Sequence, residues 1–168
     1  MLRFFLLFLL IQGVLFAAEL TQPIQQALVI PFTESIAGLS AWLVHLFDDQ
    51  VLSYGVTLWD RQSGFGVSIE AGCNGVEAMI VLVAAIVAFP TRWRHKLIGI
   101  AIGVVAIQAM NLLRIISLFY LGQWSQTAFE WGHLYVWQAL IMLDVLIVFL
   151  VWLRFLPSAQ PPPDPQHG

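Results

Sequence analysis

Five long apolar runs alternate with short polar connections along this chain. They cover about residues 4–18, 28–47, 74–90, 97–121 and 134–153. At about 1.5 Å per residue, the last two runs are long enough for the roughly 30 Å of a bilayer core. The run from Cys73 to Pro90 extends about 26 Å, and interfacial residues at its ends complete a span. The second half of the chain is therefore expected to form three consecutive membrane helices.

The two N-terminal runs differ from each other. The first predicts a helix over residues 1–20 that resembles a signal peptide, but Phe16 stands where a cleavage site needs a small residue, so we expect an uncleaved anchor. Residues 28–47 are interrupted by Pro31 and Glu34, which favours an amphipathic helix lying in the outer interface of the bilayer. The expected total is four spans, with five spans and an external N-terminus as the alternative.

Basic residues set the expected orientation. Arg92, Arg94 and Lys96 follow the third apolar run, and Arg154 follows the fifth. Because loops rich in Lys and Arg stay on the cytoplasmic side, both places are expected in the cytoplasm and the chain just before Cys73 is expected outside. A fifth span at residues 28–47 would reverse this orientation, which is the reason to expect four.

Apolar and polar side chains alternate over residues 55–70, around a polar connection at 60–64. This pattern predicts a small outward-facing β-hairpin. Residues 157–168 are rich in proline and predict a disordered cytoplasmic tail. The expected fold class is an all-α polytopic membrane protein with one membrane domain over residues 1–156, whose three-helix core is 73–156.

Composition narrows the function classes. Hydrophobic residues make up 60% of the chain and charged residues 10%, which excludes an ordinary water-soluble domain. The net charge of −3, without a basic stripe, argues against a nucleic-acid partner. The single cysteine excludes an intramolecular disulfide and a multi-cysteine zinc site, and the other histidines are scattered, so no metal and no cofactor are expected.

Three chemically active side chains are expected at one height. Measured from the basic end of its own helix, Cys73 lies about 26 Å along, Arg114 about 27 Å and His133 about 31 Å. Three helices thus bring a thiol, a guanidinium and an imidazole to one layer near the outer surface, as a cysteine nucleophile and its activators require. Gly72, Asn74 and Gly75 flank the cysteine at the expected start of a helix, where free N–H groups favour a thiolate and the glycines let a substrate backbone approach.

Each of these side chains has a plainer interpretation. Cys73 could fill space in the core, and Arg114 could form an ion pair with Glu77, which lies one turn deeper than the cysteine. His133 could be an interfacial residue that caps the last helix. As functional groups, His133 would be the general acid or base, and Arg114, with Asn111 on its face, would stabilise a thiolate or an oxyanion.

The deeper acidic residue Asp144 is expected to have a structural role. It lies at a depth comparable to that of Gln108 on the preceding helix, and we predict a hydrogen bond between the two side chains that joins the helices. A catalytic pair of Glu77 and Asp144 is disfavoured, because their depths differ by about 10 Å.

Three segments carry a resemblance to a known family: Glu-Ala-Gly-Cys-Asn-Gly-Val-Glu-Ala (70–78), Asn-Leu-Leu-Arg-Ile-Ile-Ser-Leu-Phe (111–119) and Glu-Trp-Gly-His-Leu-Tyr-Val-Trp-Gln-Ala (130–139). The chain resembles the exosortase/archaeosortase family, and exosortase H most. The resemblance implies a multi-pass protein of the bacterial inner membrane, with its active site facing the periplasm. The family's Cys, Arg and His fall on Cys73, Arg114 and His133.

The resemblance also implies an activity and a partner. A cysteine protease/transpeptidase of this kind cleaves the C-terminal sorting signal of exported proteins, made of a motif, a hydrophobic helix and a basic tail, through a thioester, and then releases or transfers the protein. For the H type the expected motif is Ile-Pro-Thr-Leu-like. Two other classes stay open: a small proton-coupled transporter that uses Glu77, and a non-catalytic subunit of a membrane assembly.

Overall fold

The structure, a computed structural model, describes residues 2–157, so the predicted disordered tail at 157–168 lies outside the described residues except for Pro157. The helices are α1 (Leu2–Glu19), α2 (Gln22–Ile24), α3 (Ile30–His45), α4 (Val76–Ala88), α5 (Trp93–Trp124), α6 (Gln126–Trp131) and α7 (Trp137–Arg154). Two π-helical segments, η1 (Gln25–Val29) and η2 (Gly132–Val136), connect α2 to α3 and α6 to α7. Strands β1 (Val51–Tyr54), β2 (Thr57–Asp60) and β3 (Gly66–Ser68) form one antiparallel sheet. The predicted class, a mostly helical membrane protein with a small β-structure, is confirmed.

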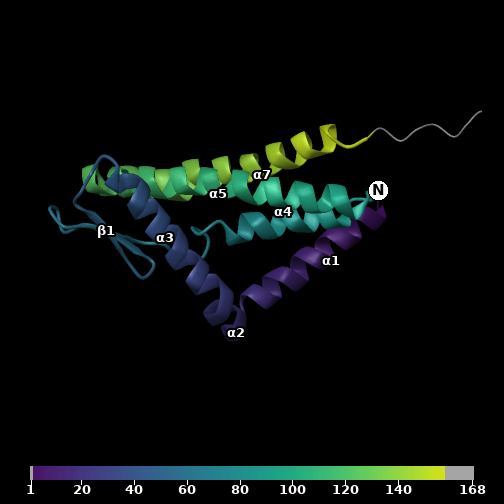
Figure 1. Cartoon of the computed structure of the whole chain (residues 1–168), viewed down its shortest axis with the longest axis horizontal. Helices are drawn as coiled ribbons and strands as arrows, with labels where there is room; N and C mark the ends of the chain where they lie inside the picture. The colour runs from purple at the N-terminus through teal and green to yellow at the C-terminus, as the bar shows by residue number, and fades with distance from the viewer. Residues whose placement is uncertain (1, 158–168) are drawn as a thin grey trace, which may run out of the picture.

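Helices α4, α5 and α7 lie side by side as a bundle (Figure 1). They share an apolar core that includes Leu82, Ile107 and Ile141. The side chain of Leu82 packs closely against the backbone of α5 at Gly103. Small residues allow such close approach between membrane helices. Much of the outward surface of α1 and α7 is exposed and apolar, as expected for helices surrounded by lipid.

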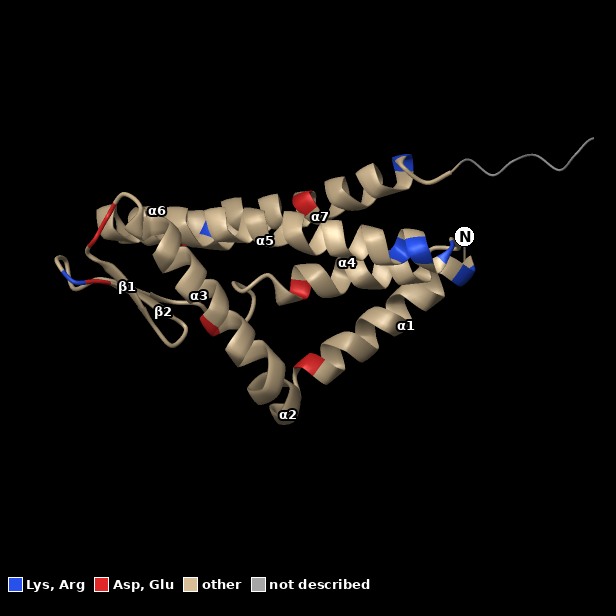
Figure 2. Cartoon of the chain, viewed as in Figure 1, with Lys and Arg blue, Asp and Glu red and all other residues tan. Residues whose placement is uncertain are grey.

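Helix α1 runs antiparallel to α4. Phe4, near the start of α1, packs against Phe89, just after α4, with their ring centroids 6.1 Å apart. Leu15, near the end of α1, lines one pocket with Met79 from the first turn of α4. Figure 2 shows Lys and Arg gathered at the other end of the bundle, where α1 and α5 begin and α7 ends. The chain therefore leaves α1 and enters α4 on the side opposite the basic residues.

Residues Gln22–His45 form a continuous helical segment that is long and apolar enough to cross a membrane, judged by length and composition only. It begins six residues before the predicted 28–47 helix, and α3 runs from α2 back toward the outer end of α5 (Figure 1). It packs on the sheet and on the outer half of α5. Helix α4, which lies in the third predicted span, has 13 residues and is shorter than the candidate spans. Because α1 ends and α4 begins on one side, a single crossing by α3 does not fit this order, and the interfacial position expected for residues 28–47 stays a prediction.

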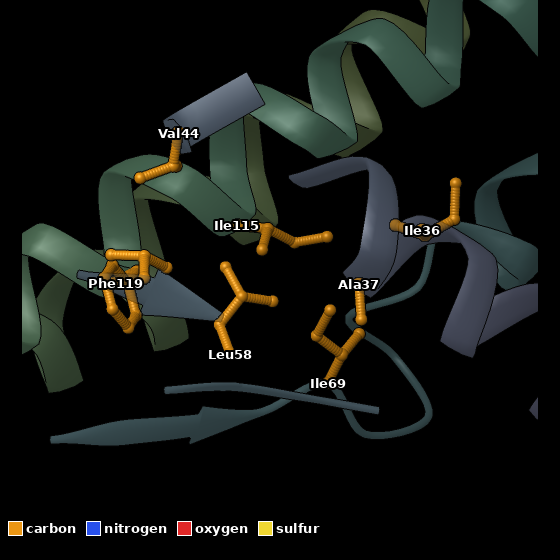
Figure 3. Close-up of a cluster of buried hydrophobic side chains, with 8 residues drawn as sticks. Ile36, Ala37, Val44, Leu58, Ile69, Ile115 and Phe119 are labelled. Carbon is orange, nitrogen blue, oxygen red and sulfur yellow. The ribbon is translucent and has the colours of Figure 1, made fainter. Parts of the chain in front are cut away.

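The predicted hairpin is part of a larger sheet. Strands β2 and β3 pair as expected, with Leu58 opposite Val67, and β1 adds a third strand that the sequence pattern did not indicate. Figure 3 shows Leu58 and Ile69 directed toward the helices, where Ile115 of α5 belongs to the same buried cluster. This cluster holds β3 and the loop after it against the outer half of α5.

Candidate active site

The loop that carries Cys73 differs from the sequence prediction. Helix α4 begins at Val76, three residues later than expected. Gly72 and Gly75 adopt φ values of +84° and +79°, which side-chain-bearing residues rarely adopt, so the chain turns sharply twice before the helix. The Cys73 N–H donates to the carbonyl of Glu70 at 2.9 Å. Cys73 therefore lies in a tight loop, outside the first turn of α4, and the expected help from the helix N-terminus is weakened because that effect fades beyond the first turn.

Cys73 and His133 are in direct contact. The Cys73 Sγ and the His133 Nε2 are 2.9 Å apart. His133 lies in the π-helical segment η2, a geometry frequent at functional sites, and its ring stacks on Phe129 with centroids 5.6 Å apart. The stacking fixes the plane of the imidazole while Nε2 faces the sulfur. A thiol and an imidazole at this distance can exchange a proton.

Arg114 reaches the same sulfur from α5. Its side chain is 3% exposed. Nη1 donates to the Gly72 carbonyl at 3.1 Å, and Nη2 lies 3.6 Å from the Cys73 Sγ. The Nε of the same guanidinium is buried and has no hydrogen-bond partner among the described residues. A positive charge held next to the sulfur stabilises negative charge there.

The ion pair weighed for Arg114 does not form in the described part of the chain, where the salt bridge found is between His45 and Asp49. Glu77 instead accepts a hydrogen bond from the Gly72 N–H. The peptide groups of Gly72 are thus held on one side by Glu77 and on the other by Arg114. This double hold sets the position of the neighbouring Cys73.

The electrostatics of Cys73 favour a protonated resting thiol. Burial raises the pKa of the thiol above its ordinary value, the Arg114 charge opposes this, and the carboxylates of Glu77 and Glu70 add to the rise. Because burial is the largest of these effects, the sulfur carries its proton at neutral pH. A neighbouring base is needed to remove that proton, and His133 is within reach of it.

A pocket of about 380 Å³ opens onto these three side chains. One wall is β3 with the loop after it, a second is the outer half of α5, and the third is η2 with the start of α7. Ile115, Leu118 and Leu134 line it with apolar surface, while Gln138 adds an amide. A chain segment that enters the pocket meets the thiol, the imidazole and the guanidinium together.

The remaining predicted site residues shape the loop, and in the described part of the chain the hydrogen bonds of the sulfur are with His133 and Arg114. The buried Asn74 donates to Thr33 Oγ1 of α3 at 3.1 Å and accepts from the Val76 N–H at 3.0 Å, which caps α4. Asn111 is fully buried and packs against Gly75, where a Cβ would lie 3.3 Å from its amide. These contacts join α3, α4 and α5 around the cysteine loop.

One expected contact is absent. The predicted hydrogen bond between Asp144 and Gln108 does not form: Gln108 Nε2 donates to the backbone carbonyl of Asn74 at 3.2 Å, and Asp144 Oδ2 is buried without a partner among the described residues. The two side chains have comparable depths but face different neighbours, because depth does not fix the direction in which a helical residue points.

Two contacts of the site were missed in the sequence. Phe129, which stacks on His133, precedes it by four residues, a spacing that places two side chains on one helix face and was a usable signal. Thr33, the partner of Asn74, lies in a distant segment, and no local pattern could have identified it. Within residues 2–157, no group of three or more His, Cys, Asp or Glu residues is arranged to hold a metal ion.

Comparison with known proteins gives one match. The model of the family described as Transmembrane exosortase (Exosortase_EpsH) matches residues 1–156 of the chain. No curated protein and no solved structure matches it.

Proposed function

The chain belongs to the transmembrane exosortase family and is a multi-pass membrane protein, and we propose that it is a cysteine protease/transpeptidase that cleaves C-terminal sorting signals. The observation that carries the proposal is the contact of Cys73 Sγ with His133 Nε2 at 2.9 Å, beside the Arg114 guanidinium, in the lining of one pocket. The three groups come from three separate segments of the chain. Packing alone does not require a thiol, an imidazole and a guanidinium to meet.

In the first step, the neutral imidazole of His133 takes the proton of the Cys73 thiol at Nε2. The thiolate attacks the carbonyl carbon of the scissile peptide bond, and the carbonyl oxygen becomes an oxyanion. Arg114 stabilises the negative charge on the sulfur before attack and that on the oxyanion after it. This role suits a residue whose charge is permanent and whose position is fixed by the Gly72 carbonyl.

In the second step, the C–N bond breaks and the imidazolium of His133 gives its proton to the departing amine. The N-terminal part of the substrate stays on Cys73 as a thioester, and its C-terminal hydrophobic helix and basic tail leave. Water or an amine of an acceptor then attacks the thioester, with His133 as the base. The Cys73 thiol is regenerated, and the exported protein is released or transferred.

The location proposed for this reaction is the periplasmic side of a bacterial inner membrane. Lys and Arg gather at the end of the bundle where α5 begins (Figure 2), and basic ends of membrane helices stay in the cytoplasm. Cys73 precedes α4, whose far end lies at that basic end. The substrate proposed is an exported protein still held in the bilayer by its C-terminal helix.

The proposal is tested with a membrane-anchored reporter that ends in an Ile-Pro-Thr-Leu-like motif, a hydrophobic helix and a basic tail. It is co-expressed with the wild type, Cys73→Ala or Cys73→Ser, at matched amounts of each protein in the membrane. The wild type is expected to convert the reporter, while both variants leave it uncut. Conversion by Cys73→Ala at the wild-type rate would falsify the cysteine mechanism and redirect attention to a transporter or an assembly subunit.

A further inference from the structure

The sheet has an open edge beside the candidate nucleophile. The strand order is β1-β2-β3, so β3 pairs with β2 on one side and is an edge strand on the other. Edge strands carry a row of unpaired backbone N–H and C=O groups, which is a template for another extended chain. Proteins usually cover or blunt such an edge, and here it lies at a pocket.

The hydrogen bonds of β3 identify the backbone groups that face this open edge. The Ile69 N–H donates to the Val56 carbonyl, and the Asp60 N–H donates to the Phe65 carbonyl, both at 2.9 Å. Since alternate residues of a strand bond to opposite sides, residues 65, 67 and 69 are directed toward β2. Gly66 and Ser68 therefore direct their N–H and C=O groups to the open edge.

The open edge forms one wall of the pocket that contains the candidate active site. Ser68 and Glu70 line the same pocket as Cys73 and His133. Phe129 and Leu134 of the helical wall also line it, and Ile115 of α5 contributes apolar surface. The pocket is thus a slot lined by residues of an edge strand and of a helical segment, and the thiol is part of the same lining.

We propose that the substrate segment around the scissile bond binds in this slot as an extended strand added to β3, with its backbone bonded to the N–H and C=O of Ser68. This inference rests on the proposed function and names how that site recognises a peptide. Strand addition keeps the scissile carbonyl out of a helix, where it would be hydrogen-bonded and shielded from the thiolate. Alternate side chains of the bound segment face the apolar wall of α5, so sequence preference falls on every second residue.

The substrate side is tested with synthetic sorting-signal peptides and the purified full chain in lipid nanodiscs. One peptide is unmodified, and each of the others carries one N-methyl group at successive positions across the motif, which removes a single backbone donor. The expected result is an alternation: methylation at every second residue lowers kcat/KM about fivefold to tenfold, and methylation between these positions has little effect. Uniform sensitivity, or no sensitivity, overturns strand addition.

The protein side is tested at Ser68. Ser68→Pro removes the N–H that faces the open edge and leaves the pairing with β2 intact, and an edge position tolerates proline. Ser68→Ala keeps the backbone donor and removes the hydroxyl that donates to Glu70 Oε1. We expect about a tenfold loss of kcat/KM for Ser68→Pro and a clearly smaller loss for Ser68→Ala, which keeps the backbone donor. Equal losses in the two variants overturn the inference.

The controls separate this inference from the proposed function. The rate at which iodoacetamide alkylates Cys73 is measured in each variant, and an unchanged rate shows that the loop and its thiol are intact. If the wild type cleaves the unmodified peptide but shows no alternation, strand addition fails and the cysteine mechanism stands. If the wild type and Cys73→Ala both leave the unmodified peptide uncut in nanodiscs while the reporter is also uncut in cells, the proposed function itself fails.

Discussion

Gly75 is the position where the cysteine loop is most sensitive to a single methyl group. Its φ of +79° costs a residue with a Cβ about 1–2 kcal/mol. A Cβ there would lie 2.6 Å from Gln108 Nε2, so Gln108 must move and give up its bond to the Asn74 carbonyl, at about 1–3 kcal/mol for the group left buried. Gly75→Ala is therefore expected to lower the free energy of unfolding by about 2–5 kcal/mol.

Gly64→Ala is the matched control. Gly64 also has a positive φ, of +70°, but a Cβ there meets no atom within 4 Å. This variant contains the backbone cost alone, about 1–2 kcal/mol. The difference between the two variants measures what the added Cβ meets at Gly75, which is Gln108 and, at 3.3 Å, the Asn111 amide, because the backbone cost is the same.

Both variants are measured by reversible unfolding in mixed detergent micelles, with tryptophan fluorescence and circular dichroism as signals. Processing of the reporter is measured in parallel, because a displaced loop separates Cys73 from His133. We expect Gly75→Ala to lose more stability than Gly64→Ala and to lose most of its processing. Equal losses of stability in the two variants would refute the argument from Gln108.

Two further predictions concern the charges around the thiol. The Arg114 charge lowers the pKa of Cys73, so in Arg114→Gln the pH midpoint of alkylation of Cys73 by iodoacetamide is expected to shift upward. Arg114→Lys keeps the charge, and its midpoint is expected to stay closer to that of the wild type. An unchanged midpoint in Arg114→Gln would contradict the contact between Arg114 and the sulfur. Glu77 acts here as an acceptor for the Gly72 N–H. Glu77→Gln, which keeps an acceptor, is therefore expected to retain most reporter processing, and Glu77→Ala is expected to lose about fivefold or more. Loss of processing in Glu77→Gln equal to that in Glu77→Ala would contradict this role as an acceptor.

The height of each side chain was predictable, and its direction was not. A helix rises by a fixed amount per residue, so counting from the basic ends placed Cys73, Arg114 and His133 in one layer, and the structure brings the three into contact. The same count placed Asp144 level with Gln108, but the two do not bond. Contact also requires that each helix has the right rotational orientation about its axis. Tertiary packing determines this orientation, and the local sequence does not.

The loop around Cys73 shows a second reason for a wrong prediction. The apolar run continues through residues 74–90, and this periodicity favoured a helix starting at the cysteine. The positive φ angles of Gly72 and Gly75 prevent a helix from starting at Cys73. The sequence alone does not show whether a glycine adopts a positive φ. Strand β1 was missed because four residues are too short to show a clear alternation, and its pairing with β2 creates the strand.

The height of the cysteine loop above the basic end of the bundle sets the length of substrate helix that can reach Cys73. Arg114, which contacts the loop, stands 18 residues after Lys96 on α5, a height of about 27 Å. Under the proposed function, a substrate helix anchored by a basic tail at the basic end of the bundle has to present its motif at that height. Four extra residues would raise the motif by about 6 Å, beyond the reach of a thiol paired to its base at 2.9 Å. Selection by length in this way needs no contact with any particular side chain of the helix, so under the proposed function helices of very different sequence are expected to be processed when they have the right span.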